Sequence, residues 1–139
     1  MMFIKKNKRI PEVYNMKILL IQPKKSKTSK GCHFKCRFCA LWKLTGGQYL
    51  TREPENIVKE LEQIEEDFVF FADDESLLDT ERMKTLAEHI KKAGIKKQYF
   101  LYGRSDTIVK NPNLIKKWKG IGLKRVFVGL EFFRDEDLK

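Results

Sequence analysis

All three cysteines of the chain lie within eight residues of one another, in the stretch GCHFKCRFCALW at residues 31–42. Cys32, Cys36 and Cys39 follow the spacing C-x3-C-x2-C. Thiolates are soft ligands that suit zinc and iron–sulfur clusters. An odd number of clustered cysteines in a chain with no export signal is typical of metal or redox chemistry, not of a disulfide framework.

The number of available ligands distinguishes the two kinds of metal site. A structural zinc site normally has four protein ligands. His33 is the only nearby candidate for a fourth ligand. Because it directly follows Cys32, it is poorly placed to complete tetrahedral coordination with the three cysteines. Three thiolates can instead each hold one iron of a cubane cluster and leave the fourth iron open to another ligand. The spacing therefore favours an iron–sulfur cluster with an open position over zinc.

The elements that must position this loop follow a regular alternation after residue 50. Amphipathic spacing and capping residues predict helices, and short apolar runs predict strands. We expect helices over 52–66, 79–94 and 111–122, a further helix from 134, and strands over 67–74, 98–106 and 124–131. Residues 16–23 are a candidate first strand. This order predicts βαβ units, in which a parallel sheet has helices outside it and the strand over 67–74 is buried on both faces.

Each predicted strand is followed by charged residues. Asp73 and Asp74 follow the first apolar run, Arg104 to Asp106 follow the second, and Glu131 follows the third. In parallel α/β folds the site of chemistry lies at the carboxyl ends of the strands. We therefore expect these side chains and the cysteine loop to share one edge of the sheet.

The charge of the chain is uneven. The net charge is +10, yet residues 1–52 carry 13 Lys and Arg against one acid, whereas residues 53–139 carry 16 against 18. A solvated basic arm explains this better than a dedicated nucleic-acid surface, although the arm could contact an anionic ligand. The apolar run at residues 18–21 is too short for a signal or a membrane span. We expect a cytoplasmic protein with no membrane partner.

The cysteine stretch also resembles the signature of a known family. CHFKCRFC, with TSKG before it and ALW after it, resembles that of the radical S-adenosylmethionine (radical SAM) superfamily. Four later stretches resemble, in order, the core of the subgroup often fused to a cobalamin-binding domain: YLTREPENIVKEL, FFADDESLLDTERMKTLAEHI, YGRSD and VGLEFFRDEDLK. The resemblance covers about residues 28–139.

The resemblance implies an α/β fold, a partial (β/α) barrel with about four of the family's six units. Residues 1–27 would form the basic arm and residues 28–139 the N-terminal part of the core. We expect a gene fragment, a decayed remnant, or half of a split enzyme whose barrel a second chain completes. Residues 23–32 are too few to hold a domain, so we do not expect this chain to bind cobalamin.

The same resemblance assigns cofactors. Cys32, Cys36 and Cys39 would ligate a 4Fe–4S cluster, and S-adenosylmethionine would chelate the open iron. A flavodoxin- or ferredoxin-like donor would supply an electron for reductive cleavage of the S–C5′ bond. The resulting 5′-deoxyadenosyl radical would abstract hydrogen from a substrate.

Five further residues would hold S-adenosylmethionine. Phe38 would lie near the adenine, Asp73 or Asp74 would accept from the amino group, Arg104 would pair with the carboxylate, and Glu131 would accept from the ribose. A carboxylate suits the arginine fork, and an ammonium suits a carboxylate. Each residue also has a structural alternative: a turn at the two aspartates, an ion pair at Arg104, a helix cap at Glu131.

Two other functional classes stay open from the sequence. One is a non-catalytic metal- or cluster-binding module whose basic arm contacts nucleic acid or a partner protein. The other is a cluster protein that only transfers electrons. S-adenosylmethionine binding separates the leading interpretation from both.

Overall fold

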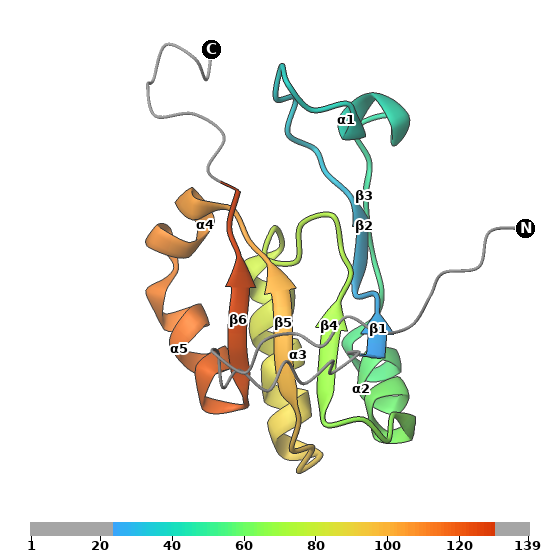
Figure 1. Cartoon of the computed structure of the whole chain (residues 1–139), viewed down its shortest axis with the longest axis vertical. Coiled ribbons are helices and arrows are strands. Elements are labelled where there is room, and N and C mark those ends of the chain that lie inside the picture. Colours follow the sequence, from blue (N-terminus) through green and yellow to red (C-terminus); the bar gives the residue numbers. More distant parts are fainter. Residues whose placement is uncertain (1–23, 130–139) are drawn as a thin grey trace, which may run out of the picture.

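The computed structural model describes residues 24–129, and its larger sheet is parallel throughout (Figure 1). The strand order is β1-β4-β5-β6, with every neighbouring pair parallel. The four strands are β1 (Lys24–Ser26), β4 (Phe68–Phe71), β5 (Gln98–Tyr102) and β6 (Leu123–Phe127). The predicted α/β class, a parallel sheet with helices outside it, is confirmed and is consistent with a partial barrel.

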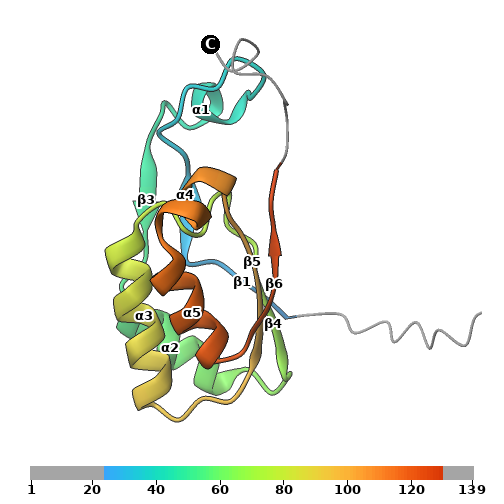
Figure 2. The same ribbon diagram turned by 90° about the vertical axis from the view of Figure 1, so that its left-hand side faces the viewer.

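The helices pack on one face of this sheet (Figure 2). They are α2 (Pro54–Gln63), α3 (Thr80–Lys92), α4 (Ser105–Lys110) and α5 (Pro112–Gly120). Proline occupies the first turn of α2 and of α5, where its missing N–H costs nothing. The Asp79 side chain caps α3 by accepting from the Arg82 N–H at 3.0 Å. The three predicted helices are confirmed with slightly shorter bounds, and α4 was not predicted.

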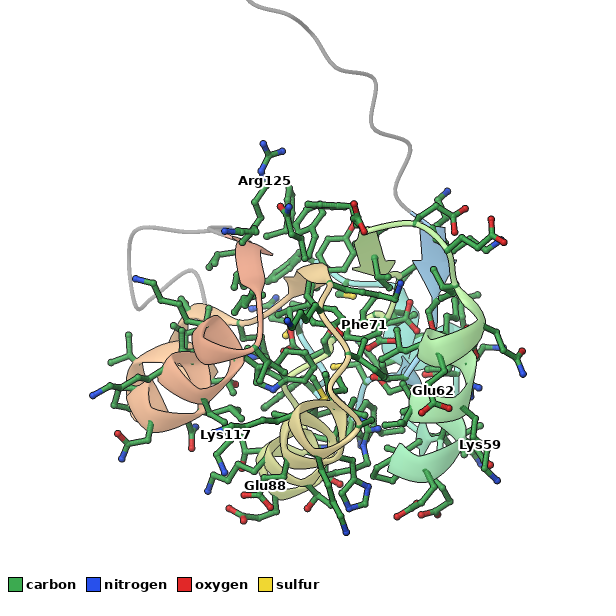
Figure 3. All side chains as sticks on the ribbon, turned by 90° about the horizontal axis from the view of Figure 1, so that it is seen from below. Lys59, Glu62, Phe71, Glu88, Lys117 and Arg125 are labelled. Atoms are coloured by element: carbon green, nitrogen blue, oxygen red, sulfur yellow. The ribbon has the colours of Figure 1, made fainter. Side chains whose placement is uncertain are left out.

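The core lies between the helices and the sheet. Phe71, Tyr99 and Trp118 are fully buried there, with ring centroids 5.6–5.9 Å apart. Figure 3 shows Phe71 in the interior, while Glu88 and Lys117, which form an ion pair, lie on the outer side of the helices. The Trp118 indole N–H donates to the Met83 carbonyl at 3.0 Å, so its buried polar atom is satisfied.

The other face of the sheet differs from the prediction. In β4, Val69 and Phe71 are buried whereas Phe68 and Phe70 are only half-buried. The expectation of a strand buried on both faces is wrong within residues 24–129, because the described helices cover one face only.

A small antiparallel ribbon stands above the parallel sheet. It pairs β2 (Ser29–Gly31) with β3 (Tyr49–Thr51), and a short helix, α1 (Leu41–Leu44), lies in the loop that it closes. Neither the ribbon nor β1 was predicted. The candidate strand at 16–23, the helix from 134 and Glu131 lie outside the described residues. None of the described helices is long and apolar enough to cross a membrane.

Candidate functional site

The cysteine loop lies at the carboxyl edge of the parallel sheet, as the sequence predicted (Figure 1). It runs from β2 to β3, whose pairing Gly31↔Tyr49 brings its two ends together. Gly31 has φ +89°, and a Cβ there would lie 2.1 Å from the Gln48 carbonyl oxygen. Only glycine permits both this dihedral angle and this backbone approach. Glycine at position 31 therefore allows the two ends of the loop to pair at its base.

Hydrogen bonds inside the loop centre on the Cys36 carbonyl. It accepts from the Cys39 N–H at 3.1 Å and from the Trp42 indole N–H at 3.1 Å. Trp42 thereby attaches α1 to the cysteine segment. Cys32, Cys36 and Cys39 are half-buried free thiols with no disulfide among them.

Arg104 reaches this loop from the end of β5. Its Nη1 lies 3.7 Å from Cys36 Sγ, and its guanidinium lies 4.0 Å from the centroid of the Phe34 ring. Asp106 holds it with two bonds, Nε–Oδ1 at 2.9 Å and Nη2–Oδ2 at 3.1 Å. Hydrogen bonding between the two side chains raises the pKa of Arg104 and lowers the pKa of Asp106. Arg104 therefore makes both contacts at once: Nε and Nη2 bind Asp106, and Nη1 faces Cys36.

Asp73 and Asp74 support the ribbon. Buried Asp73 accepts from the Thr28 N–H at 2.6 Å, from the Thr28 hydroxyl at 2.6 Å and from the Ser29 N–H at 2.9 Å. Exposed Asp74 accepts from the Gly31 N–H at 2.6 Å. Both carboxylates thus hold the base of the cysteine loop. Their predicted role toward the amino group of a ligand stays a prediction.

Glu75 is a site residue that sequence reasoning missed. It is buried, and its Oε1 accepts from the Leu77 N–H at 3.2 Å and from the Arg104 N–H at 3.3 Å. Burial raises the pKa of Glu75. Burial also raises the pKa of Cys32, and the nearby Glu75 charge adds to that rise. The signal was present, because Glu75 is the third acid in succession after β4.

The structure gathers some of the predicted residues and not others. Cys32, Cys36, Arg104 and the added Glu75 lie near one another at the sheet edge. Phe38 lies in the same loop with half of its surface exposed. Phe34, which the sequence did not single out, stacks on Arg104.

The thiols suit a cluster by their chemistry. Within residues 24–129 no three His, Cys, Asp or Glu side chains are arranged as a ready metal site. Three unoxidised thiols on one loop, one of them beside a guanidinium, are nevertheless the donor set that an iron–sulfur cluster takes. Metal binding commonly organises its own ligands, so the loop would close as it binds.

Comparison with known proteins identifies the family of this chain. The sequence model of the radical SAM superfamily matches residues 26–139, and the chain belongs to that superfamily. Membership confirms the resemblance and makes the chain an enzyme by resemblance. The family in general implies a 4Fe–4S cluster and S-adenosylmethionine.

Two curated relatives are similar over most of this chain. One is hopanoid C-3 methylase of Methylococcus capsulatus, 33% identical over 111 residues, which are 80% of this chain and 22% of the relative. The other is anaerobic magnesium-protoporphyrin IX monomethyl ester cyclase of Rubrivivax gelatinosus, 27% identical over 107 residues, 74% of this chain and 19% of the relative. The chain therefore spans about a fifth of the length of these relatives.

Proposed function

We propose that Cys32, Cys36 and Cys39 bind a 4Fe–4S cluster, and that the chain binds S-adenosylmethionine beside it. The observation that carries this proposal is the guanidinium of Arg104, oriented by Asp106 and 3.7 Å from Cys36 Sγ. A cation at that place is suited to the carboxylate of a ligand that also reaches the cluster.

In this proposal, different residues bind different groups of S-adenosylmethionine or support the cysteine loop. Asp106 occupies Nε and Nη2 of Arg104, so Nη1, which contacts Cys36 Sγ, is the nitrogen that would meet a ligand carboxylate. Glu75 accepts two backbone N–H groups on Oε1, and its carboxylate would accept from the ammonium group of the ligand. When bound, the cluster and S-adenosylmethionine would supply radical chemistry, in which one electron from an external donor cleaves the S–C5′ bond to leave methionine and a radical able to take hydrogen from a substrate. Asp73 and Asp74 keep the loop in place at the sheet edge.

Anaerobic reconstitution with iron and sulfide tests the proposal. We expect iron and sulfide to bind, and the EPR signal of the reduced protein to change when S-adenosylmethionine is added. Cys36→Ala should lose the intact cluster. A colourless zinc protein, or a cluster that ignores S-adenosylmethionine, would contradict the proposal.

A pair of variants tests the role of Arg104 separately. Arg104→Ala should still assemble a cluster but lose the EPR change on adding S-adenosylmethionine. Lys110→Ala removes an exposed cation at the far end of α4 and should keep both properties. Equal responses of the two variants would exclude Arg104 from ligand binding.

A further inference from the structure

Positive charge is concentrated on the segment that carries the cysteines. Residues 27–52 contain six Lys and Arg and no Asp or Glu, whereas residues 53–129 contain 14 of each. Acids from the rest of the chain meet this segment at its base. Asp73 and Asp74 accept from its backbone N–H groups, Glu75 is buried near Cys32, and Asp106 is paired with Arg104. The charged side chains that this segment itself exposes are therefore all basic.

Exposed leucines lie among these cations. Lys30, Leu44, Thr45, Gln48 and Leu50 line a hollow of about 240 Å³. Lys30 and Leu50 are partners across the β2–β3 ribbon. Leu44 is 82% exposed and Leu50 is 59% exposed. We name Lys30, Lys43, Leu44 and Leu50 the basic loop surface.

This surface is close to the candidate cluster ligands. Lys30 precedes Cys32 by two residues, so their Cα atoms are at most about 7.6 Å apart. On the other side, Lys43 and Leu44 belong to α1, which the bond from Trp42 to the Cys36 carbonyl attaches to the cysteine segment. A protein seated on the basic loop surface would therefore lie beside the cluster.

We propose that the basic loop surface is the docking site of a small acidic one-electron carrier protein of the flavodoxin type. The inference rests on the proposed function, in which the cluster must receive an electron. The reduced carrier loses one electron and the cluster gains it, with no bond made or broken. Complementary charge steers such an encounter and raises its rate.

The leucines favour a protein over a nucleic acid as the partner. Apolar side chains with charges at their rim are the usual anatomy of a protein interface. A phosphate backbone is held mainly by cations and needs no exposed leucine between them. On the basic loop surface, Lys30, Leu44 and Leu50 line one small hollow, and Lys43 precedes Leu44 on α1.

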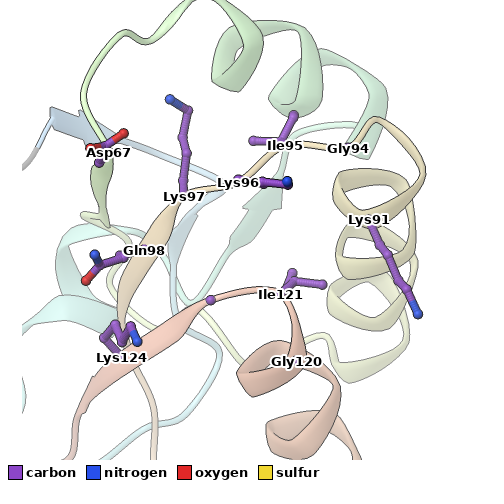
Figure 4. A pocket seen from close by; sticks show the side chains of 11 residues that line it. Asp67, Lys91, Gly94, Ile95, Lys96, Lys97, Gln98, Gly120, Ile121 and Lys124 are labelled. Atoms are coloured by element: carbon purple, nitrogen blue, oxygen red, sulfur yellow. The ribbon is translucent and has the colours of Figure 1, made fainter.

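Two matched double variants test the proposal. The first combines Lys30→Glu with Lys43→Glu on the basic loop surface. The control combines Lys91→Glu with Lys124→Glu, which line a separate hollow of about 540 Å³ at the amino edge of the sheet (Figure 4). Both doubles reverse two lysine charges, so they differ only in where the charge changes.

The first measurement is the rate at which reduced flavodoxin reduces the reconstituted cluster, followed by stopped flow. At low ionic strength we expect the loop double to be slower by about tenfold or more, and the control to stay within about twofold of wild type. The difference should shrink at high salt because screening removes the steering. Equal rates for the two doubles would overturn the proposal.

The second measurement does not need the cluster. Calorimetry measures the binding of oxidised flavodoxin to the wild type and both doubles, whether or not they hold iron. Weaker binding by the loop double alone supports the docking site, even if cluster assembly and with it the proposed function fail. Absent or equal binding overturns it, and so does a single-stranded DNA oligonucleotide that displaces flavodoxin and binds more tightly through the same lysines.

Discussion

Three consecutive acids after β4 have three different surroundings. Asp73 is buried and accepts three hydrogen bonds, Asp74 is exposed and accepts one, and Glu75 is buried beside the backbone of Arg104. In the sequence, these three acidic residues indicated only that the strand ends in polar residues. Their donors are about 30 to 45 residues away along the chain, so the role of each became visible only in the fold.

Removing Asp73 should destabilise the protein far more than removing Asp74. Asp73→Ala leaves two buried backbone N–H groups and a buried hydroxyl without an acceptor, at a cost of about 3–5 kcal/mol. Asp74→Ala, the matched control, loses one exposed acceptor and should cost about 1 kcal/mol. Urea denaturation of both variants measures the difference. Similar midpoints would contradict the assignment of Asp73 as the main support of the ribbon.

Glu75 should make stability depend on pH. Because burial raises its pKa in the folded state above the ordinary 4.5, the folded protein binds this proton more tightly than the unfolded chain. The contribution of protonated Glu75 to the free energy of unfolding is therefore fully present below about pH 4.5. It is lost as the pH rises through the pKa of Glu75 in the folded state. Glu75→Gln keeps an acceptor oxygen and should be the more stable protein at pH 7.

Urea denaturation at pH 4 and pH 7 checks this prediction. The difference in free energy of unfolding between Glu75→Gln and wild type should be small at pH 4 and should increase toward pH 7. A gap that narrows with rising pH would contradict the sign of the shift.

At the scale of elements, the β2–β3 ribbon decides where the cysteines lie. Asp73 holds the start of β2 at Thr28 and Ser29, and Asp74 holds its end at Gly31, where the ribbon continues into the cysteine loop. Each of its strands has only three residues, so their sequences carry too little alternation to predict a pair. The ribbon forms because the carboxylates after β4 satisfy its backbone donors.

Gly31→Ala should therefore disturb the loop. A Cβ at Gly31 would lie 2.1 Å from the Gln48 carbonyl oxygen, so the ribbon must open. Gly46→Ala is the matched control, because Gly46 also has positive φ (+63°) yet nothing lies within 4 Å of its Cβ position. We expect Gly31→Ala to lose iron binding and the control to keep it at a cost of about 1 kcal/mol.

Iron content after reconstitution, together with hydrogen exchange at residues 29–31 and 49–51, measures this effect. Full iron and unchanged exchange in Gly31→Ala would show that the close approach of the backbone is not required.

At the scale of the whole molecule, the described helices lie on one face of the sheet (Figure 2). The opposite face carries aromatic rings from three strands. Their centroids are 4.8 Å apart for Phe70 and Phe100, 5.4 Å for Phe70 and Tyr102, and 5.2 Å for Tyr102 and Phe127. The two faces should therefore contribute differently to stability.

Trp118 and Phe127 test this difference. Trp118 is fully buried on the helix-covered face, so Trp118→Ala should cost about 3–5 kcal/mol. Phe127 is 56% exposed on the other face, so Phe127→Ala should cost about 1 kcal/mol or less, mainly the lost contact with Tyr102. Urea denaturation measures both. Comparable losses would mean that the second face is as tightly packed as the first.

The sequence by itself determined the three thiols, the family and the order of the main helices and strands. These depend on local information: spacing of ligands, periodicity of apolar residues, and prolines and caps at helix ends. Only the tertiary structure decided that Lys24–Ser26 is a strand, that Arg104 stacks on Phe34 beside Cys36, and that Asp73 holds the ribbon. The reason is physical, because each of those features depends on partners more than 40 residues away, and nothing in a local pattern records them.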